Sequence, residues 1–265
     1  MIIIGEKINS SIPASRAMIE AMDGCALAAL ASAQHDAGAT YIDINAGTFL
    51  EKEGEHLAFI ARALKDTINV PLSIDTPSAA AAEQALKVLG PGRNLINSVT
   101  AEPVRLEQMS SLAVEYGCGV VALCMQASHM PEDIESRLKT ADMLVESLTK
   151  KGIKSGEIYI DPMLRPLGAD ETSGTDALET IRRLRSLFPD CHITVGLSNL
   201  SFGLPKRRLI NRAFVVAAMS AGLDAAIADP LDRELMGLIF ASEAILGRDE
   251  FCLEFIGRCR SGEIV

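Results

Sequence analysis

The sequence predicts a single (β/α)8 barrel, the α/β fold in which eight parallel strands each lead into a helix. Three observations support this prediction. Eight short β-rich segments alternate with stretches rich in Ala, Leu, Glu and Lys. The chain has 265 residues, a length at which an α/β barrel still forms one domain. Neither a Pro/Gly/Ser-rich linker nor a block of like charges marks a boundary, so we expect one domain over residues 1–265.

The elements follow one another in a regular order. The expected strands are residues 1–5, 40–45, 71–75, 94–98, 119–125, 157–161, 192–198 and 224–229. The expected helices are residues 26–37, 55–67, 78–89, 104–116, 132–151, 175–186, 209–221 and 231–246. An open doubly wound sheet usually has fewer strands, so eight such pairs favour a closed barrel. Two longer connections, 162–174 and 199–208, follow strands and are expected to be active-site loops, and residues 247–265 should add a short helix or loop.

Composition excludes several classes of protein. Apolar residues make up 48% of the chain and charged residues 23%, as in ordinary globular domains. The 25 basic and 35 acidic residues give a net charge of −10, and basic residues form no long run, so nucleic acid is not an expected partner. No apolar run is long enough for a membrane span or a signal peptide. We therefore expect a cytoplasmic enzyme whose six cysteines, which include no Cys-x-x-Cys pair, stay reduced.

Polar residues stand at the carboxyl ends of nearly all the expected strands. They are Glu6, Asn9, Asp43, Asn45, Asp75, Asn97, Gln126, Asp161, Ser198, Asn199 and Asp229. Any one of them could be a helix cap or a turn residue, as Asp229 before Pro230 illustrates. Strand ends converge on one rim of a barrel, so together they predict a cup that binds a polar, planar ligand through carboxylates and amides.

Other kinds of site have weak support. The four histidines show no metal-binding spacing, which predicts a site without a metal. The segment around Ser198 is not Gly-x-Ser-x-Gly, so a serine nucleophile is not expected. Lys7 is the only lysine near a strand end that could serve Schiff-base chemistry.

Eight short motifs carry a resemblance to a known family. They are MIIIGEKIN (1–9), DINAG (43–47), IDT (74–76), INS (96–98), YIDP (159–162), GLSN (196–199), LINR (209–212) and GLDAAIAD (222–229). In this order, over essentially the whole chain, they resemble the methyltetrahydrofolate:corrinoid protein methyltransferases. The resemblance implies a pterin-binding (β/α)8 barrel, usually a homodimer, that moves a methyl group between N5 of tetrahydrofolate and the cobalt of a corrinoid. Its substrates would be tetrahydrofolate or 5-methyltetrahydrofolate and a cobalamin or other corrinoid.

The resemblance also implies roles for individual residues. Asp75, Asn97 and Asp161 match positions that hydrogen-bond the pterin ring, and Asn199 matches the catalytic asparagine near N5. The remaining matched positions belong to the same pocket and rim; they are Gly196, Ser198, Arg207, Glu6, Asn9, Asp43 and Asn45. Acetogenic members carry a glutamine where Phe202 stands, which bears on folate contact and on the direction of methyl transfer.

Two alternative functions stay open, and a partner protein is expected. A dihydropteroate synthase would use a similar pocket together with a pyrophosphate site, for which Lys206, Arg207 and Arg208 could supply charge. A folate-binding module without catalysis would keep the same rim. The chain has no Asp-x-His-x-x-Gly corrinoid signature, so the corrinoid is expected to arrive on a partner protein that docks over the rim. The direction of transfer and the upstream methyl donor stay open.

Overall fold

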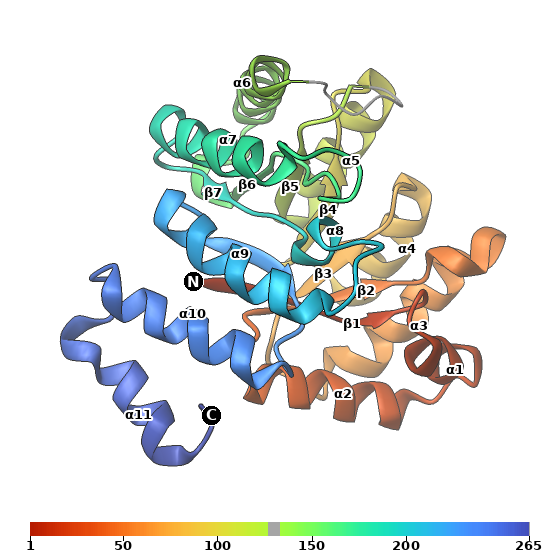
Figure 1. Ribbon diagram of the computed structural model, residues 1–265. Coiled ribbons are helices and arrows are strands. Elements are labelled where there is room, and N and C mark those ends of the chain that lie inside the picture. The colour runs from red at the N-terminus through yellow and green to blue at the C-terminus, as the bar shows by residue number, and fades with distance from the viewer. Residues whose placement is uncertain (127–132, 265) are drawn as a thin grey trace.

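Eight parallel strands form one sheet in the order β7-β6-β5-β4-β3-β2-β1-β8 in the computed structural model, which describes residues 1–126 and 133–264. The strands are β1 Ile2–Asn9, β2 Tyr41–Asn45, β3 Leu72–Asp75, β4 Leu95–Val99, β5 Gly119–Leu123, β6 Ile158–Asp161, β7 His192–Ile193 and β8 Ala225–Ala228. The two ends of this order meet where Gly196 forms a parallel bridge with Ile227. The predicted (β/α)8 barrel is therefore confirmed, with helices surrounding the strands (Figure 1).

Helices follow the strands as the sequence predicts. They are α1 Pro13–Glu20, α2 Gly24–Asp36, α3 Glu53–Lys65, α4 Ala79–Leu89, α5 Pro103–Tyr116, α6 Ile134–Lys150, α7 Ser173–Leu187, α8 Leu197–Leu200, α9 Arg207–Ala221, α10 Arg233–Ile245 and α11 Leu253–Ser261. The described part of the chain also contains three 3₁₀ turns: η1 Gly47–Lys52, η2 Ser155–Glu157 and η3 Glu250–Cys252. Glu132, where helix 132–151 was expected to begin, and His129 lie outside the described residues.

Three local predictions are wrong. The first strand continues to Asn9 instead of ending at Gly5, and the short helix α1, which has Pro13 in its first turn, was not expected. The seventh strand is not 192–198, because β7 ends at Ile193 and the chain turns into α8 at Leu197. The fifth strand ends at Leu123, two residues before Met125.

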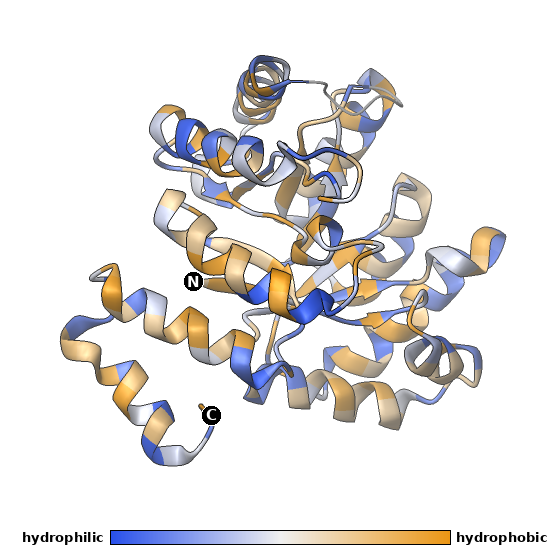
Figure 2. Cartoon of the chain, in the orientation of Figure 1, coloured by the Kyte–Doolittle hydropathy of each residue, from blue (hydrophilic) through white to orange (hydrophobic). Residues whose placement is uncertain are grey.

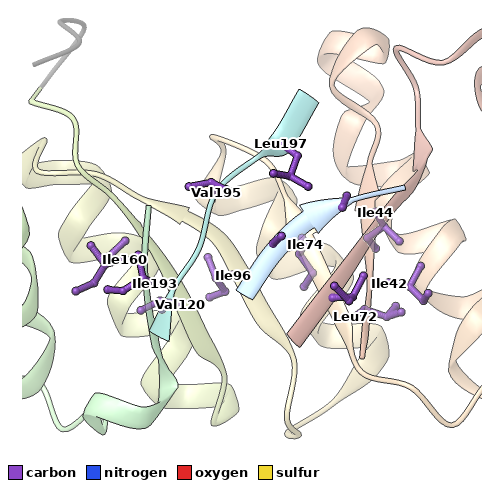
Figure 3. Packing of buried hydrophobic residues seen from close by; sticks show 14 of the residues in the cluster. Ile42, Ile44, Leu72, Ile74, Ile96, Val120, Ile160, Ile193, Val195 and Leu197 are labelled. Atoms are coloured by element: carbon purple, nitrogen blue, oxygen red, sulfur yellow. The ribbon is translucent and has the colours of Figure 1, made fainter. Parts of the chain in front are cut away.

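Along each strand, side chains point alternately toward the surrounding helices and toward the barrel axis. Ile42, Ile44 and Ile74 are fully buried against the surrounding helices, in the larger of the two apolar clusters. Figure 3 shows these isoleucines together with their neighbours on the other strands. Successive residues of a strand point to opposite faces, so Tyr41, Asp43 and Asn45 share the other face, toward the barrel axis.

The amino-terminal half of the barrel interior is closed by a second apolar cluster. It consists of Ile4, Tyr41, Leu95, Val121, Tyr159 and Ala225. The rings of Tyr41 and Tyr159 meet edge to face at 6.2 Å, and the Tyr159 hydroxyl donates to the Tyr41 hydroxyl at 3.4 Å. This layer is the floor of a cup, so a ligand can enter only from the carboxyl ends of the strands.

Candidate functional site

A buried polar network lies directly above the tyrosine floor, on β2, β3 and β4. The Asp43 Oδ1 accepts hydrogen bonds from Ser73 Oγ at 2.6 Å and from Asn97 Nδ2 at 3.2 Å. Burial, with the nearby charge of Asp75, raises the pKa of Asp43 well above its usual range. The network holds the Asn97 amide in one orientation, with its carbonyl oxygen left for another donor.

A second pair lies two residues further along β2 and β3. Asn45 and Asp75 are register partners in the parallel β2–β3 ladder, and Asn45 Nδ2 donates to Asp75 Oδ2 at 2.9 Å. The Asn45 Oδ1 accepts from Ser10 Oγ and from the Gly47 N–H, so this amide is held on both sides. Burial raises the pKa of Asp75. Its other carboxylate oxygen accepts no side-chain hydrogen bond from the described residues, so it can accept one from a ligand.

Asp161 ends β6 and is 6% exposed. Its Oδ1 accepts from the Met163 N–H at 2.7 Å. Burial raises the pKa of Asp161 to about 6, although hydrogen bonds from the Met163 and Gly196 N–H groups act in the opposite direction. A buried carboxylate that titrates close to neutral pH is a mark of a functional site.

Glu6 and Ser198 join β1 to α8. The Ser198 Oγ donates to Glu6 Oε1 at 2.8 Å, and Arg207 Nη2 donates to the Ser198 carbonyl at 2.5 Å. Gly5 pairs with Ile42 whereas Ile8 pairs with Ile44, so β1 carries an extra residue where Glu6 lies. Burial raises the pKa of Glu6. The two hydrogen bonds fix the position of α8 over the barrel mouth.

Asn199 lies on α8 with an exposed side chain. Its backbone N–H donates to the Gly196 carbonyl at 3.1 Å, which forms the single turn of α8. A Cβ atom on Gly196 would lie 3.0 Å from Asn199 Nδ2, closer than most side-chain contacts allow. Glycine at position 196 therefore leaves room for this amide.

A cavity of about 260 Å³ opens beside α8. It is lined by Glu6, Leu197, Ser198, Arg207, Arg208, Asn211, Ala228, Asp229, Asp232 and Leu235. The Lys7 ammonium forms an ion pair with Asp229 at 3.1 Å. Lys7 is the lysine near a strand end that could have served Schiff-base chemistry. The Asn9 Oδ1 accepts from the backbone N–H and hydroxyl of Ser11, so Asn9 acts within its own loop.

The structure thus brings the predicted residues into two groups. Asp43, Asn45, Asp75 and Asn97 interact with one another on the β2–β4 side of the mouth, as do Glu6, Ser198 and Arg207 on the α8 side. Asp161 and Gly196 lie between them in sheet order, and Asn199 makes no side-chain hydrogen bond within the described residues.

Two residues of the site were missed. Ser73 precedes Asp75 by two positions, so the alternation of β3 already puts both on one face, and this signal could have found it. Arg105 donates to the Ser98 carbonyl from Nε at 3.1 Å and from Nη2 at 2.9 Å, which holds the end of β4. Nothing in the spacing of the sequence predicts that contact.

Within residues 1–126 and 133–264 no helix is long and apolar enough to cross a membrane. The same part of the chain contains no group of three or more His, Cys, Asp or Glu side chains that could hold a metal ion.

Comparison with known proteins gives concordant results. Residues 14–229 match the family of pterin binding enzymes. The chain is 36% identical over 269 aligned residues to the methylcorrinoid:tetrahydrofolate methyltransferase of Eubacterium limosum, covering 100% of this chain and 98% of that protein. It is 30% identical to the methionine synthase of Mycobacterium tuberculosis over 86% of this chain but 20% of that protein. The dihydropteroate synthase of Vibrio fischeri ES114 superposes with a TM-score of 0.71 at 19% identity, covering 93% of each chain, which shows a shared fold.

Proposed function

The chain belongs to the pterin-binding enzymes, in the methyltetrahydrofolate:corrinoid methyltransferase family, and we propose that it moves a methyl group between N5 of tetrahydrofolate and the cobalt of a corrinoid. The observation that carries this function is the 36% identity to a methylcorrinoid:tetrahydrofolate methyltransferase over essentially the full length of both chains. The polar cup above an apolar floor suits a planar pterin.

The β2–β4 side and Asp161 have the donor and acceptor pattern that a pterin needs. Its N3–H and 2-amino groups are donors, for which the carboxylates of Asp75 and Asp161 are acceptors, and Asn97 can both donate and accept. Asp43 orients the Asn97 amide and Asn45 orients the Asp75 carboxylate, through the bonds described above. In this proposal Asp43 and Asn45 are positioning residues, whereas Asp75, Asn97 and Asp161 touch the ring.

Asn199 is the residue proposed to act at N5. When the methyl group leaves for the corrinoid, the electron pair of the C–N bond passes to N5, which must gain a proton or a strong hydrogen bond. The Asn199 amide can donate to N5 as this charge develops, and the proton itself comes from water. In the reverse direction the lone pair of the neutral N5–H attacks the methyl carbon, the electron pair of the Co–C bond leaves with cobalt as Co(I), and N5 gives up its proton to water. The same amide orients the ring in that direction. The corrinoid supplies a strong nucleophile or a methyl donor at cobalt, so the protein contributes mainly position and N5 activation.

Glu6, Ser198, Gly196 and Arg207 support that amide. The Glu6–Ser198 bond anchors α8 to β1, and Arg207 holds the Ser198 carbonyl from the start of α9. Gly196 provides the space that Asn199 occupies. A short helix fixed at both ends keeps the orienting group in place before substrate binds, which lowers the cost of reaching the reactive geometry.

The corrinoid is proposed to reach the barrel mouth on a partner protein, because these 265 residues contain no Asp-x-His-x-x-Gly signature. The assembly into a homodimer, the single domain over residues 1–265 and the cytoplasmic location stay predictions.

An anaerobic optical assay tests the function. Methylcobalamin with tetrahydrofolate, and cob(I)alamin with methyltetrahydrofolate, are each followed with and without the protein. Protein-dependent interconversion of the methyl-Co(III) and Co(I) spectra is expected in at least one direction, and the ratio of the two rates shows which direction of methyl transfer the protein favours under these conditions.

The negative outcomes separate the alternatives. Folate binding by calorimetry without turnover, also in the presence of a corrinoid protein, would identify a binding module and contradict methyl transfer. Formation of dihydropteroate from a dihydropterin pyrophosphate and p-aminobenzoate would instead identify a synthase.

A further inference from the structure

Strand β1 contains an extra residue where it reaches the barrel mouth. Two of its residues, Glu6 and Lys7, stand opposite the single residue Asp43 of β2, because the register shifts between Gly5 and Ile8. A bulge of this kind interrupts the ladder and redirects a side chain, and such bulges are frequent beside active sites. The extra residue therefore points to a function for the side chains that it redirects.

Two buried side chains from neighbouring helices hold the bulge in place. The Lys7 N–H donates to Gln34 Oε1 of α2 at 3.0 Å, and the Lys7 carbonyl accepts from Ser15 Oγ of α1 at 2.5 Å. Gln34 is 0% exposed and Ser15 is 2% exposed. A Cβ atom at Gly5 would lie 2.7 Å from the same Gln34 oxygen, so glycine leaves room for that amide. The position of Glu6, next to Lys7, is thus fixed before any substrate binds.

The Glu6 carboxyl group has one hydrogen-bond partner within the described residues. Its Oε1 accepts from Ser198 Oγ at 2.8 Å, and its Oε2 accepts from none of them. Burial raises the pKa of Glu6, and the charge of Asp229 acts in the same direction. The Ser198 hydrogen bond and the charges of Lys7 and Arg207 act against this shift. A buried carboxyl group with a raised pKa and an unbound oxygen is suited to take up and release a proton.

The same carboxyl group borders a space that can hold water. Glu6 and Ser198 both line the cavity of about 260 Å³ beside α8, and a cavity of this size has room for several water molecules. Arg207 and Arg208 line it from the start of α9, and Figure 2 shows this end of α9 as hydrophilic. A proton on Glu6 can therefore pass to water without crossing the barrel core.

The proposed methyl transfer moves a proton as well as a methyl group. When the lone pair of N5 takes up the methyl group, the nitrogen still bears its hydrogen and becomes positively charged, so that proton must leave. The Asn199 amide only donates and accepts hydrogen bonds and does not take up a proton at neutral pH. Ser198 directly precedes Asn199 in α8, and its hydroxyl already donates to a carboxylate.

Building on the proposed function, we propose that Ser198 and Glu6 carry the N5 proton to the water of this cavity. The Ser198 Oγ accepts the proton from the methylated N5, and the electron pair of the N–H bond stays on nitrogen. The hydroxyl proton of Ser198 passes at the same time along its 2.8 Å hydrogen bond to Glu6 Oε1. Glu6 then releases the proton to water. When tetrahydrofolate is the product, the proton follows the same path from water to N5.

The variant Glu6→Gln tests this path. Glutamine keeps an oxygen that accepts from Ser198, so α8 stays anchored, but it cannot take up a proton. With methylcobalamin and saturating tetrahydrofolate under anaerobic conditions, kcat should fall by about 10²-fold, the usual loss of a proton-transfer group. The KM and the calorimetric dissociation constant of tetrahydrofolate should stay near the wild-type values. Glu6→Asp, which restores a carboxyl group, should recover about tenfold of the lost rate.

A matched control removes another carboxylate from the same end of the barrel. Glu51 is exposed on η1, which follows β2 at the mouth. Glu51→Gln therefore changes the charge of the mouth by the same amount without touching Ser198, and kcat should stay at the wild-type value.

The pH profile separates proton transfer from a purely structural role. If ionised Glu6 takes up the proton, kcat should rise with pH through the pKa of Glu6 and then level off, and Glu6→Gln should lack this rise. The other charged groups that face Glu6 come from four parts of the barrel; they are Lys7 of β1, Asp43 of β2, Arg207 of α9 and Asp229 after β8. These groups remain in Glu6→Gln, so a rise that persists in the variant would belong to one of them and overturn the proposal.

A second variant tests whether the two residues act in one path. Ser198→Ala should lower kcat about as much as Glu6→Gln, and the double variant should lose no more than either single variant, because each change interrupts the same path. Losses that multiply in the double variant would assign the residues to separate roles and overturn the proposal.

The remaining outcomes are also separable. A kcat within about twofold of wild type in Glu6→Gln, or an equal loss of rate and folate affinity, would leave Glu6 as an anchor of α8 only and overturn the proton path. In either case methyl transfer by the wild-type protein stands. A wild-type protein that transfers no methyl group in either direction, also with a corrinoid protein, would instead remove the proposed function itself.

Discussion

The two sides of the barrel mouth differ in how far their polar groups are satisfied. On the β2–β4 side, Asp43, Asn45, Asp75 and Asn97 are hydrogen-bonded to one another before any ligand binds. On the α8–α9 side, Asn199 and Phe202 are exposed, and Lys206 has no ionic partner among the described residues. A site that must recognise a ring and also admit a large partner benefits from both arrangements, one rigid and one open.

The open side carries the largest expected effect. Asn199→Ala removes the donor proposed to act on N5 while the rest of the cup is unchanged. We expect the methyl-transfer rate to fall by about 10²- to 10³-fold, the usual loss when one transition-state donor is removed. Folate affinity should change far less, because the amide acts mainly as charge develops. Single-turnover kinetics and calorimetry measure the two quantities, and an equal loss in both would contradict a role at N5.

Asp161 lies between the two sides in sheet order, and its substitution should change binding of the pterin. Asp161→Asn replaces a carboxylate acceptor by an amide that presents a donor to the pterin edge. A charge-assisted hydrogen bond contributes about 1.5–3 kcal/mol, so the pterin dissociation constant should rise by about 10- to 100-fold. Glu157→Gln, at the opposite end of β6, is a control for a generic change of charge near this strand. Unchanged pterin affinity in Asp161→Asn would remove this residue from the site.

The pH dependence of binding follows from the same carboxyl group. Its pKa of about 6 means that protonation below pH 6 removes the acceptor, so pterin affinity should fall about tenfold between pH 7 and pH 5. The Asp161→Asn variant should lose this dependence. Calorimetric titrations over that pH range provide the comparison, and parallel pH profiles for the two proteins would rule out Asp161 as the titrating group.

The free energy of unfolding should change with pH in the direction opposite to that of pterin affinity. The pKa of Asp161 is raised from 3.8 to about 6, so the folded state binds the proton more tightly than the unfolded chain. Its contribution to stability is therefore fully present below about pH 4 and is lost as the pH rises through 6, with a magnitude of at most about 3 kcal/mol. Asp161→Asn should accordingly unfold at higher denaturant concentration than wild type at pH 7, and a lower midpoint would contradict this account.

The smallest effect is expected at Phe202. Because its ring is 66% exposed, Phe202→Ala should leave the unfolding midpoint almost unchanged. Phe202 offers a surface on which the p-aminobenzoyl ring of tetrahydrofolate can stack. Removing this surface should weaken tetrahydrofolate binding by a few-fold, since an aromatic pair contributes about 0.5–1.5 kcal/mol. Binding of a pterin that lacks the benzoyl group serves as the control and should not change. Equal weakening for both ligands would place Phe202 against the pterin ring instead.

Patterns along the chain were enough to predict the barrel and most of the cup. Eight β/α repeats specify the fold, and the two-residue period of a strand puts Tyr41, Asp43 and Asn45 on one face. The same period puts an apolar floor below a polar rim, because Tyr159 precedes Asp161 by two positions. The β/α repeats and the alternation within a strand involve residues that are close together in the chain, so they can be recognised from the sequence.

Which polar groups form hydrogen bonds with one another depends on how the strands are paired in three dimensions. Asn97 and Asp43 are 54 residues apart. They form a hydrogen bond across β3, because the register pairs Asp43 with Ser73 and pairs Asn97 with Asp75, two residues further along that strand. The turn of the chain into α8 after the short strand β7 likewise depends on the closing bridge between Gly196 and Ile227, which no local pattern encodes. Long-range contacts are selected by barrel closure and strand register, whereas strand periodicity selects only the face on which a residue lies.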